Sequence, residues 1–137
     1  MTKVMPINEE YSFDDKVIIT QTDSAGVITY ANRMFCKVSG YTYDELIGQP
    51  HKVLRHPDMP KKVFEKVWKT ISSGQAWNGI IKNLRSDGLY YWVNAEILPI
   101  VDDEYNITGY ISVRKQASFK DIKESQELYE KMLIDEE

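Results

Sequence analysis

The hydrophobic positions change their spacing several times along the chain, and each change predicts a new element. Residues 17–20 and 27–30 are short runs rich in β-branched side chains. The turn-forming residues 22–26 join them, so the pair predicts a β-hairpin. Apolar residues then recur at helical spacing from Asn32, the predicted N-cap, to Gly40.

The middle of the chain predicts two further helices separated by a loop. Residues 42–48 begin with the Thr and Glu of a capping box and end at a glycine, which predicts a short helix. Three prolines interrupt residues 49–60, so we expect a loop or broken helical turns there. Pro60 then begins an amphipathic helix that ends at Gly74. Its apolar face consists of Val63, Phe64, Val67, Trp68 and Ile71.

Beyond Gly74 the apolar residues alternate, as expected for β-strands. Residues 77–83, 89–100 and 107–114 predict three strands joined by two polar turns. Residues 118–137 return to helical spacing with an apolar stripe. This order predicts an α+β fold: a five-stranded antiparallel sheet with short helices on one face, plus a flanking C-terminal helix.

Length and composition fit one small globular domain. The 137 residues are 42% hydrophobic and 28% charged, which is typical of a folded rather than a disordered chain. The net charge of −4 argues against a nucleic-acid partner. No apolar run approaches the roughly 20 residues of a membrane span, and the start lacks the apolar core of a signal peptide. We therefore expect a cytoplasmic protein without direct membrane insertion. Its parts are an N-terminal arm (1–15), a central domain (16–116) and a C-terminal amphipathic helix (117–137).

Catalysis and metal binding have little support in the sequence. The single cysteine, Cys36, excludes an internal disulfide and a multi-thiolate metal site. No nucleophile–base pair or glycine-rich phosphate loop stands out, and two histidines make a poor metal cage. We therefore do not expect an enzyme.

Two sets of motifs resemble the PAS family of sensor domains. The general PAS signature corresponds to Asp23-Ser-Ala-Gly-Val-Ile-Thr-Tyr-Ala-Asn32, Ser39-Gly40-Tyr41 and Glu45-Leu-Ile-Gly48. A more specific run is Arg55-His56-Pro57-Asp58-Met59-Pro60, followed by Trp77-x-Gly79 and Lys82-Asn83. This run is similar to the PAS sensors of bacterial aerotaxis receptors, which bind FAD. The similarity covers about residues 17–133, so the central domain is expected to be a PAS sensor domain.

The resemblance implies a set of flavin contacts. They are Asn32, Arg55, His56, Asp58, Phe64, Trp77 and Asn83. Arg55 can place a planar cationic fork on the FAD pyrophosphate. Phe64 and Trp77 offer flat walls for an aromatic ring, and Gly79 leaves space beside it. His56 and Asp58 can hydrogen-bond to the ribityl chain or the adenine side.

Several of these residues also have an ordinary structural explanation. Asn32 serves equally well as a helix cap. Arg55 and Asp58, taken without the motif, could pair with each other or cap the helix that Pro60 begins. Asn83 is the hardest to explain without a ligand, because a buried carboxamide needs a hydrogen-bond partner.

We expect a sensor that binds FAD non-covalently and reports redox or oxygen state to a chemotaxis receptor or another signalling protein. Reduction would change the hydrogen bond at Asn83, and the change would reach the last strand and the C-terminal helix. Dimerisation is expected from the class of domain. Whether the chain is a free-standing subunit or a fragment of a receptor stays open.

Two alternatives keep the fold: one has a different ligand and the other has none. A haem-binding PAS sensor would use His51 or His56 as the axial ligand. A PAS domain without ligand would only dimerise or dock to a partner, for which the C-terminal apolar stripe is suitable. In light-sensing relatives a cysteine lies where His51 would align, so we do not expect a flavin–thiol adduct at Cys36.

Overall fold

One antiparallel sheet organises the fold, with the strand order β2-β1-β5-β4-β3. The computed structural model describes residues 3–14 and 16–136; the positions 1, 2, 15 and 137 of the predicted arm and C-terminal helix lie outside the described residues. The strands are β1 (Ile18–Asp23), β2 (Ile28–Ala31), β3 (Trp77–Leu84), β4 (Tyr90–Val101) and β5 (Ile107–Gln116). The helical elements are α1 (Arg33–Ser39), α2 (Tyr43–Leu46), the 3₁₀ turn η1 (His51–Leu54), α3 (Lys61–Ser72) and α4 (Phe119–Glu136). The predicted α+β architecture is confirmed.

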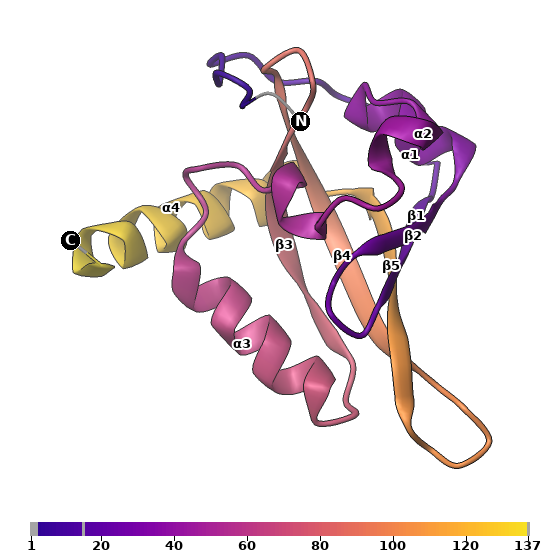
Figure 1. The fold of residues 1–137 in the computed structure, drawn as a ribbon. Helices are drawn as coiled ribbons and strands as arrows, with labels where there is room; N and C mark the ends of the chain where they lie inside the picture. Colours follow the sequence, from indigo (N-terminus) through magenta and orange to yellow (C-terminus); the bar gives the residue numbers. More distant parts are fainter. Residues whose placement is uncertain (1–2, 15, 137) are drawn as a thin grey trace.

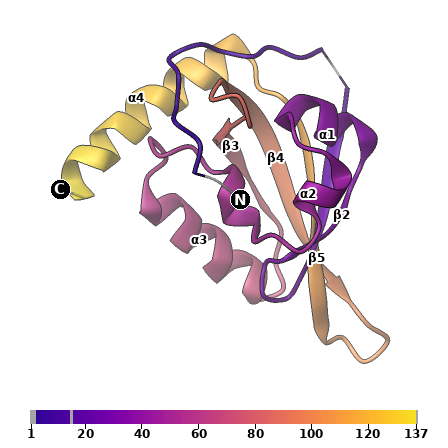
Figure 2. The same ribbon diagram turned by 45° about the horizontal axis from the view of Figure 1, so that its top comes forward.

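The short helices lie on one face of the sheet, and α4 lies against the other (Figure 1). Tyr129 of α4 stacks on Trp92, with ring centroids 6.4 Å apart. Because side chains alternate along a strand, Trp92 points to the face opposite to that of its buried neighbour Tyr91. Figure 2 shows the consequence: the edge strand β3 runs between α3 and α4.

The local helix signals are confirmed in the first half of the chain. Asn32 is the N-cap of α1, and its side chain accepts a hydrogen bond from Phe35 N. Gly40 ends the helix in the left-handed region at φ 79°, where a side chain would be strained. Thr42 and Glu45 form the predicted capping box of α2.

Residues 3–14 of the N-terminal arm contain no helix and, apart from one isolated bridge, no regular strand pairing. Glu10 forms a parallel bridge with Tyr90, and Tyr11 N donates to Tyr90 O at 2.7 Å. Ile7 N donates to Gly88 O in the adjacent turn. The arm therefore pairs with backbone groups at the start of β4.

Strand β3 is at one edge of the sheet, and side chains and loop backbone bind its outer backbone groups. Tyr129 Oη donates to Ile80 O at 2.5 Å, and His56 N donates to Lys82 O at 3.3 Å. Lys82 N in turn donates to Met59 Sδ at 3.4 Å. These contacts use edge groups that would otherwise be free to pair with another strand. They also fix the loop that follows η1 against β3.

The core has two parts, with a cavity beside them. The larger part packs α1, α2 and η1 on the sheet around buried residues such as Phe35, Leu54 and Tyr91. The smaller part packs Val67 and Ile71 of α3 against the sheet. The cavity lies between α3, η1 and the sheet.

Candidate functional site

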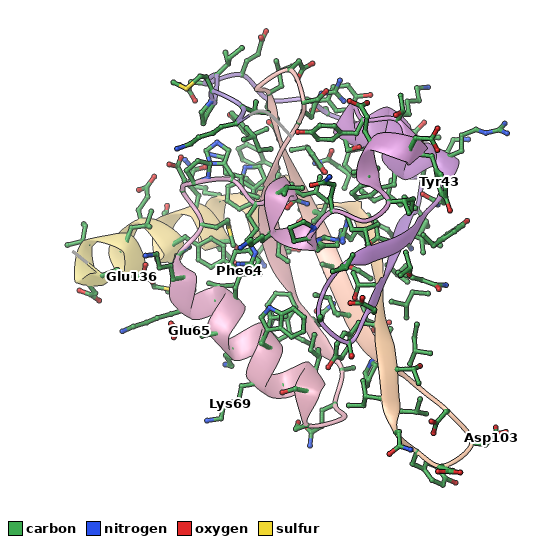
Figure 3. All side chains as sticks on the ribbon, viewed as in Figure 1. Tyr43, Phe64, Glu65, Lys69, Asp103 and Glu136 are labelled. Atoms are coloured by element: carbon green, nitrogen blue, oxygen red, sulfur yellow. The ribbon has the colours of Figure 1, made fainter. Side chains whose placement is uncertain are left out.

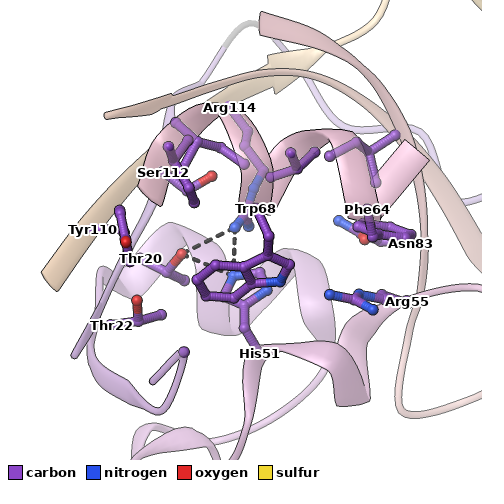
Figure 4. A pocket seen from close by; sticks show the side chains of 15 residues that line it. Thr20, Thr22, His51, Arg55, Phe64, Trp68, Asn83, Tyr110, Ser112 and Arg114 are labelled. Atoms are coloured by element: carbon purple, nitrogen blue, oxygen red, sulfur yellow. Dashed lines mark hydrogen bonds between the residues drawn. The ribbon is translucent and has the colours of Figure 1, made fainter. Parts of the chain in front are cut away.

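The cavity opens between α3 and the inner face of the sheet (Figure 4). Its lining residues are Thr20, Thr22, Gly26, His51, Arg55, Phe64, Val67, Trp68, Ile71, Ile81, Asn83, Ile97, Tyr110, Ser112 and Arg114. The space inside it is about 70 Å³, and the hollow is partly open to solvent. A largely apolar hollow with a few polar groups is typical of a small-molecule site, and at this volume a ring-sized ligand would have to displace side chains of the wall.

Arg114 is the main polar feature of the cavity wall. It is only 2% exposed, and its Nη2 donates to Thr20 Oγ1 at 3.0 Å and to His51 Nε2. Among the described residues, Nη1 has no hydrogen-bond partner and no carboxylate pairs with the guanidinium. Burial lowers the pKa of Arg114 to about 10, so the side chain is still charged at neutral pH. A buried cation without a counter-ion is unfavourable unless a ligand compensates it.

A second buried polar atom on the same wall lacks a partner. Ser112, two residues before Arg114 on β5 and on the same face, is 6% exposed, and its Oγ makes no hydrogen bond to any described residue. Buried polar atoms are nearly always paired in folded proteins, so two such atoms in one cavity are places where a water molecule or a polar ligand binds.

His51 lies beside Arg114 because η1 is fixed to the β1–β2 turn. Its backbone N donates to Gly26 O at 2.9 Å, and its Nε2 lies 3.1 Å from Thr20 Oγ1. Burial, followed by the charges of Arg114 and Arg55, lowers the pKa of His51 well below its ordinary value of 6.5. Because a guanidinium can only donate, Nε2 is the acceptor, and the proton of the neutral ring lies on Nδ1.

Three of the residues predicted as flavin contacts meet in the cavity. The Arg55 guanidinium lies 3.8 Å from the centroid of the Phe64 ring, a cation–π contact. Arg55 and Asn83 form an isolated antiparallel bridge, so the loop and β3 hold them side by side. Asn83 is 3% exposed, and Figure 4 shows it beside Phe64 and Arg55. Burial lowers the pKa of Arg55 from its ordinary value.

His56 and Asp58 lie outside this cavity. His56 borders a second, more open hollow, which shares Arg55, Phe64 and Trp68 with the first. Its Nδ1 accepts a hydrogen bond from Asp58 N at 3.0 Å. Burial and then the nearby charge of Lys82 lower the pKa of His56. The carboxylate of Asp58 is exposed and pairs with Lys82 Nζ at 3.2 Å.

Asn32 and Trp77 also lie outside the residues that line the cavity. Asn32 Oδ1 accepts from Ile19 N and Phe35 N, and its Nδ2 donates to Val17 O. The carboxamide thus joins α1 to β1, which is the structural explanation of this residue. The indole of Trp77 lies over Gly79, where a Cβ would be 2.5 Å from the ring. The space that Gly79 leaves is therefore filled by Trp77 itself.

Trp68 packs against the smaller part of the core, as the helical pattern predicts, and also extends across the cavity (Figure 4). Its six-membered ring reaches Gly26, where a Cβ would lie 3.1 Å from Cη2 and Cζ2. The indole also meets Tyr110 edge-on, with centroids 5.5 Å apart. Gly26, which adopts φ 87°, therefore provides both the turn and the room for this side chain.

Sequence reasoning missed Arg114, Thr20 and Ser112 as site residues, and it considered His51 only as a haem ligand. A signal for Arg114 was present. Alternation along β5 places Arg114 on the same face as Tyr110 and Ser112, so an arginine occupies an inward position of a strand. Such a residue needs a buried partner.

Comparison with known proteins agrees with this geometry. The family model described as the PAS fold matches residues 28–114, and the chain belongs to this family. It is 47% identical over 116 residues to the aerotaxis receptor of Escherichia coli K12, a match that covers 85% of this chain and 23% of the receptor. It is 30% identical to the nitrogen fixation regulatory protein of Klebsiella pneumoniae, over 74% of this chain and 21% of that protein. The chain thus spans about a quarter or less of these relatives.

A solved structure shares the fold over nearly the whole chain. It is described as "Flavin Analogue Sheds Light on Light-Oxygen-Voltage Domain Mechanism". The superposition has a TM-score of 0.69 at 25% sequence identity and covers 90% of this chain and 89% of that one. Within residues 3–14 and 16–136, no helix has the length and apolar character needed to cross a lipid bilayer.

Proposed function

We propose that this chain is a cytoplasmic sensor domain that binds FAD non-covalently and reports redox or oxygen state to a chemoreceptor or a similar signalling partner. The observation that carries the proposal is the apolar cavity in which Arg114 Nη1 and Ser112 Oγ are buried without a partner among residues 3–14 and 16–136. The similarity to an aerotaxis receptor and to a light-oxygen-voltage domain studied with a flavin analogue supports FAD as the ligand.

The residues present suit a flavin ring system. Phe64, Trp68 and Ile81 supply flat or apolar walls, which would hold an aromatic ring and exclude water. Asn83 would meet a polar edge of the ring, because its carboxamide can both donate and accept a hydrogen bond. When bound, the flavin would supply a centre that takes up electrons and protons. Arg114 would stabilise the added negative charge, and burial strengthens this interaction.

The second hollow would hold the remainder of the dinucleotide. Arg55 borders both hollows, so its guanidinium lies where a phosphate leaving the inner cavity would pass. A guanidinium binds phosphate oxygens with two parallel hydrogen bonds. His56 and Lys61 also line this hollow and can donate to the ligand. Asp58 would act through Lys82, with which it pairs.

The proposed output passes through β5 to α4. Arg114 lies on β5, which is paired to β1 and β4 and continues into α4 after a short connection. A change of charge in the cavity would act directly on Arg114 and Asn83. We also propose that α4, which follows β5, takes part in homodimerisation and in binding the signalling partner.

The haem alternative has weaker support from the geometry. His51 Nε2 is already the acceptor for Arg114, and a neighbouring cation opposes a bound metal ion. His56 Nδ1 accepts from Asp58 N, so the proton of the neutral ring lies on Nε2. In each ring the unprotonated nitrogen, which would have to bind iron, already accepts a hydrogen bond.

An absorption spectrum of the purified protein tests the proposal. We expect a flavin band, with FAD as the chromophore that denaturation releases, and a reductive titration that bleaches it. A Soret band would show that the protein binds haem and would contradict the flavin proposal. A protein that stays colourless after incubation with FAD would contradict the proposal and leave a docking module.

A further inference from the structure

The N-terminus of α3 is capped by a residue from the far end of the chain. Its N-cap position is Pro60, which forms no side-chain cap. Glu136 in the last turn of α4 supplies the missing acceptor: Oε1 accepts from Lys61 N at 3.2 Å and Oε2 from Lys62 N at 3.1 Å. Figure 3 shows Glu136 at the end of α4, close to the first turns of α3 that carry Phe64 and Glu65.

This contact combines two favourable effects at one place. First-turn N–H groups have no partner within their own helix, and a carboxylate that accepts from them acts as a cap. The negative charge also meets the positive end of the α3 dipole and the two lysines of its first turn. The cap is available only while the last turn of α4 is folded and docked.

Helix α3 also forms one wall of the cavity. Phe64 follows the capped turn directly, and Trp68 lies one turn further and crosses to Gly26. Any ligand that displaces these side chains must act on the helix that Glu136 holds. The middle of α4 is fixed separately, because Tyr129 stacks on Trp92 and donates to Ile80 O.

We infer that the two hydrogen bonds from Lys61 N and Lys62 N to the Glu136 carboxylate, here called the latch, couple α3 to the last turn of α4. Through them α3 transmits the state of the cavity to that turn. The route is independent of the one through β5, because it passes along the cavity-lining helix. A shift of α3 changes the positions of Lys61 N and Lys62 N relative to the carboxylate. The end of α4 is then released while Tyr129 keeps its middle in place. The nature of the stimulus rests on the proposed function, but the latch does not.

Amide hydrogen exchange measured by NMR tests the latch in the protein without flavin. Glu136→Ala is compared with Glu127→Ala, which removes an exposed carboxylate from the same helix. We expect Glu136→Ala to speed exchange at Lys61 and Lys62 about fivefold, the change produced by loss of one N-cap. Glu127→Ala should leave it unchanged. Equal exchange in both variants would overturn the latch.

A double-mutant cycle tests the connection to the cavity. Trp68→Phe alters the cavity wall, and it is measured with Glu136 present and with Glu136→Ala. We expect Trp68→Phe to change exchange in the last turn of α4 only while Glu136 is present. Additive effects would show that the cap is purely structural. Thermal unfolding of each variant identifies loss of fold, in which case Trp68→Tyr replaces Trp68→Phe.

Flavin binding then separates the latch from the proposed function. If FAD changes exchange at Lys61 and Lys62 through this contact, the coupling is reciprocal, and Glu136→Ala should change FAD affinity in turn. A protein that binds no FAD but passes the double-mutant cycle would contradict the proposed function and retain the latch. A protein in which FAD changes exchange at Lys61 and Lys62 but binds equally with and without Glu136 would contradict the latch.

Discussion

Arg55 and Asn83 face each other across an isolated antiparallel β-bridge, although one belongs to a loop and the other to an edge strand. Two neighbouring hydrogen bonds between the same segments, from His56 N to Lys82 O and from Lys82 N to Met59 Sδ, hold the loop in this position. A fixed cation and a buried carboxamide therefore lie side by side at the cavity. The two residues differ in where they lie: Arg55 borders both hollows, and Asn83 only the inner one. Their substitutions should have different effects.

Arg55→Ala should lose flavin. Loss of a charge-assisted contact to a phosphate is expected to weaken FAD binding roughly 10- to 100-fold. For FMN, which has a single phosphate, the difference in affinity between the variant and the unchanged protein should be smaller. Isothermal titration with both flavins measures this, and Lys52→Ala, at the exposed residue of η1, is the matched control. A flavin-replete Arg55→Ala protein would contradict the proposed pocket.

Asn83→Ala should retain part of the flavin and weaken the response to reduction. The carboxamide is the group expected to exchange donor and acceptor roles when the ring is protonated. The readout is the difference in amide exchange of α4 between the oxidised and reduced forms. Asn78→Ala, on the same strand but exposed, is the control. An unchanged redox difference in Asn83→Ala would exclude this residue from the signal.

Arg114→Met should lower the midpoint potential of bound flavin. The buried cation favours the reduced, more negatively charged flavin, so its removal should lower the potential. In a one-electron step, each tenfold loss of this preference lowers the midpoint potential by about 60 mV. Lys115→Met removes an exposed cation from the next position of β5 and should leave the potential nearly unchanged. Spectroelectrochemical titration measures both. Equal potentials in the two variants would argue against Arg114 as the charge partner.

Asn32→Ala should destabilise the fold and leave flavin affinity unchanged. The side chain makes three hydrogen bonds to backbone groups and none to the cavity, so its loss is expected to cost about 1 to 2 kcal/mol of unfolding free energy. Urea unfolding measures the first effect and FAD titration the second. Weaker FAD binding by the folded variant would restore Asn32 as a ligand contact.

Stability should fall as the pH drops below 6.5. The pKa values of His51 and His56 are both lowered in the folded protein, chiefly by burial. Between the ordinary pKa of 6.5 and the lowered values, the unfolded chain therefore binds more protons. The stabilising effect is complete above pH 6.5 and is lost as the pH falls through the folded pKa values, with a slope of at most about 1.4 kcal/mol per pH unit for each histidine.

Urea unfolding of the flavin-free protein at pH 7.5, 6.5 and 5.5 measures this dependence. The double variant His51→Gln, His56→Gln should show a flatter profile over this interval. If the unchanged protein and the double variant lose stability equally, the histidines are not its cause.

The sequence determined the elements and much of their order, because the signals involved act over a few residues. The cap at Asn32, the capping box from Thr42 to Glu45 and the end at Gly40 all depend on neighbours within one helical turn. Alternation in 77–83 likewise predicted which side chains share a face. The strand limits were less accurate: β1 continues to Asp23, within the predicted turn, because β5 pairs with it along its whole length.

The resemblance to the aerotaxis family added three cavity residues that local patterns could not identify, namely Arg55, Phe64 and Asn83. It did not distinguish them from Asn32, Trp77 and Asp58, whose side chains the structure places in structural contacts or at the surface. Their proposed roles toward flavin remain predictions.

Only the tertiary structure decided which distant groups share an environment. Arg114, His51 and Thr20 come together because β5 pairs with β1 and η1 docks on the β1–β2 turn. Glu136 reaches α3 because α4 crosses the opposite face of the sheet. A side chain's burial and partners depend on segments far away in the sequence, whereas helix caps and alternation depend on a few adjacent residues. For this reason the sequence could predict the fold, and only the folded chain placed in the wall of a cavity a buried cation that no carboxylate of the described residues pairs with.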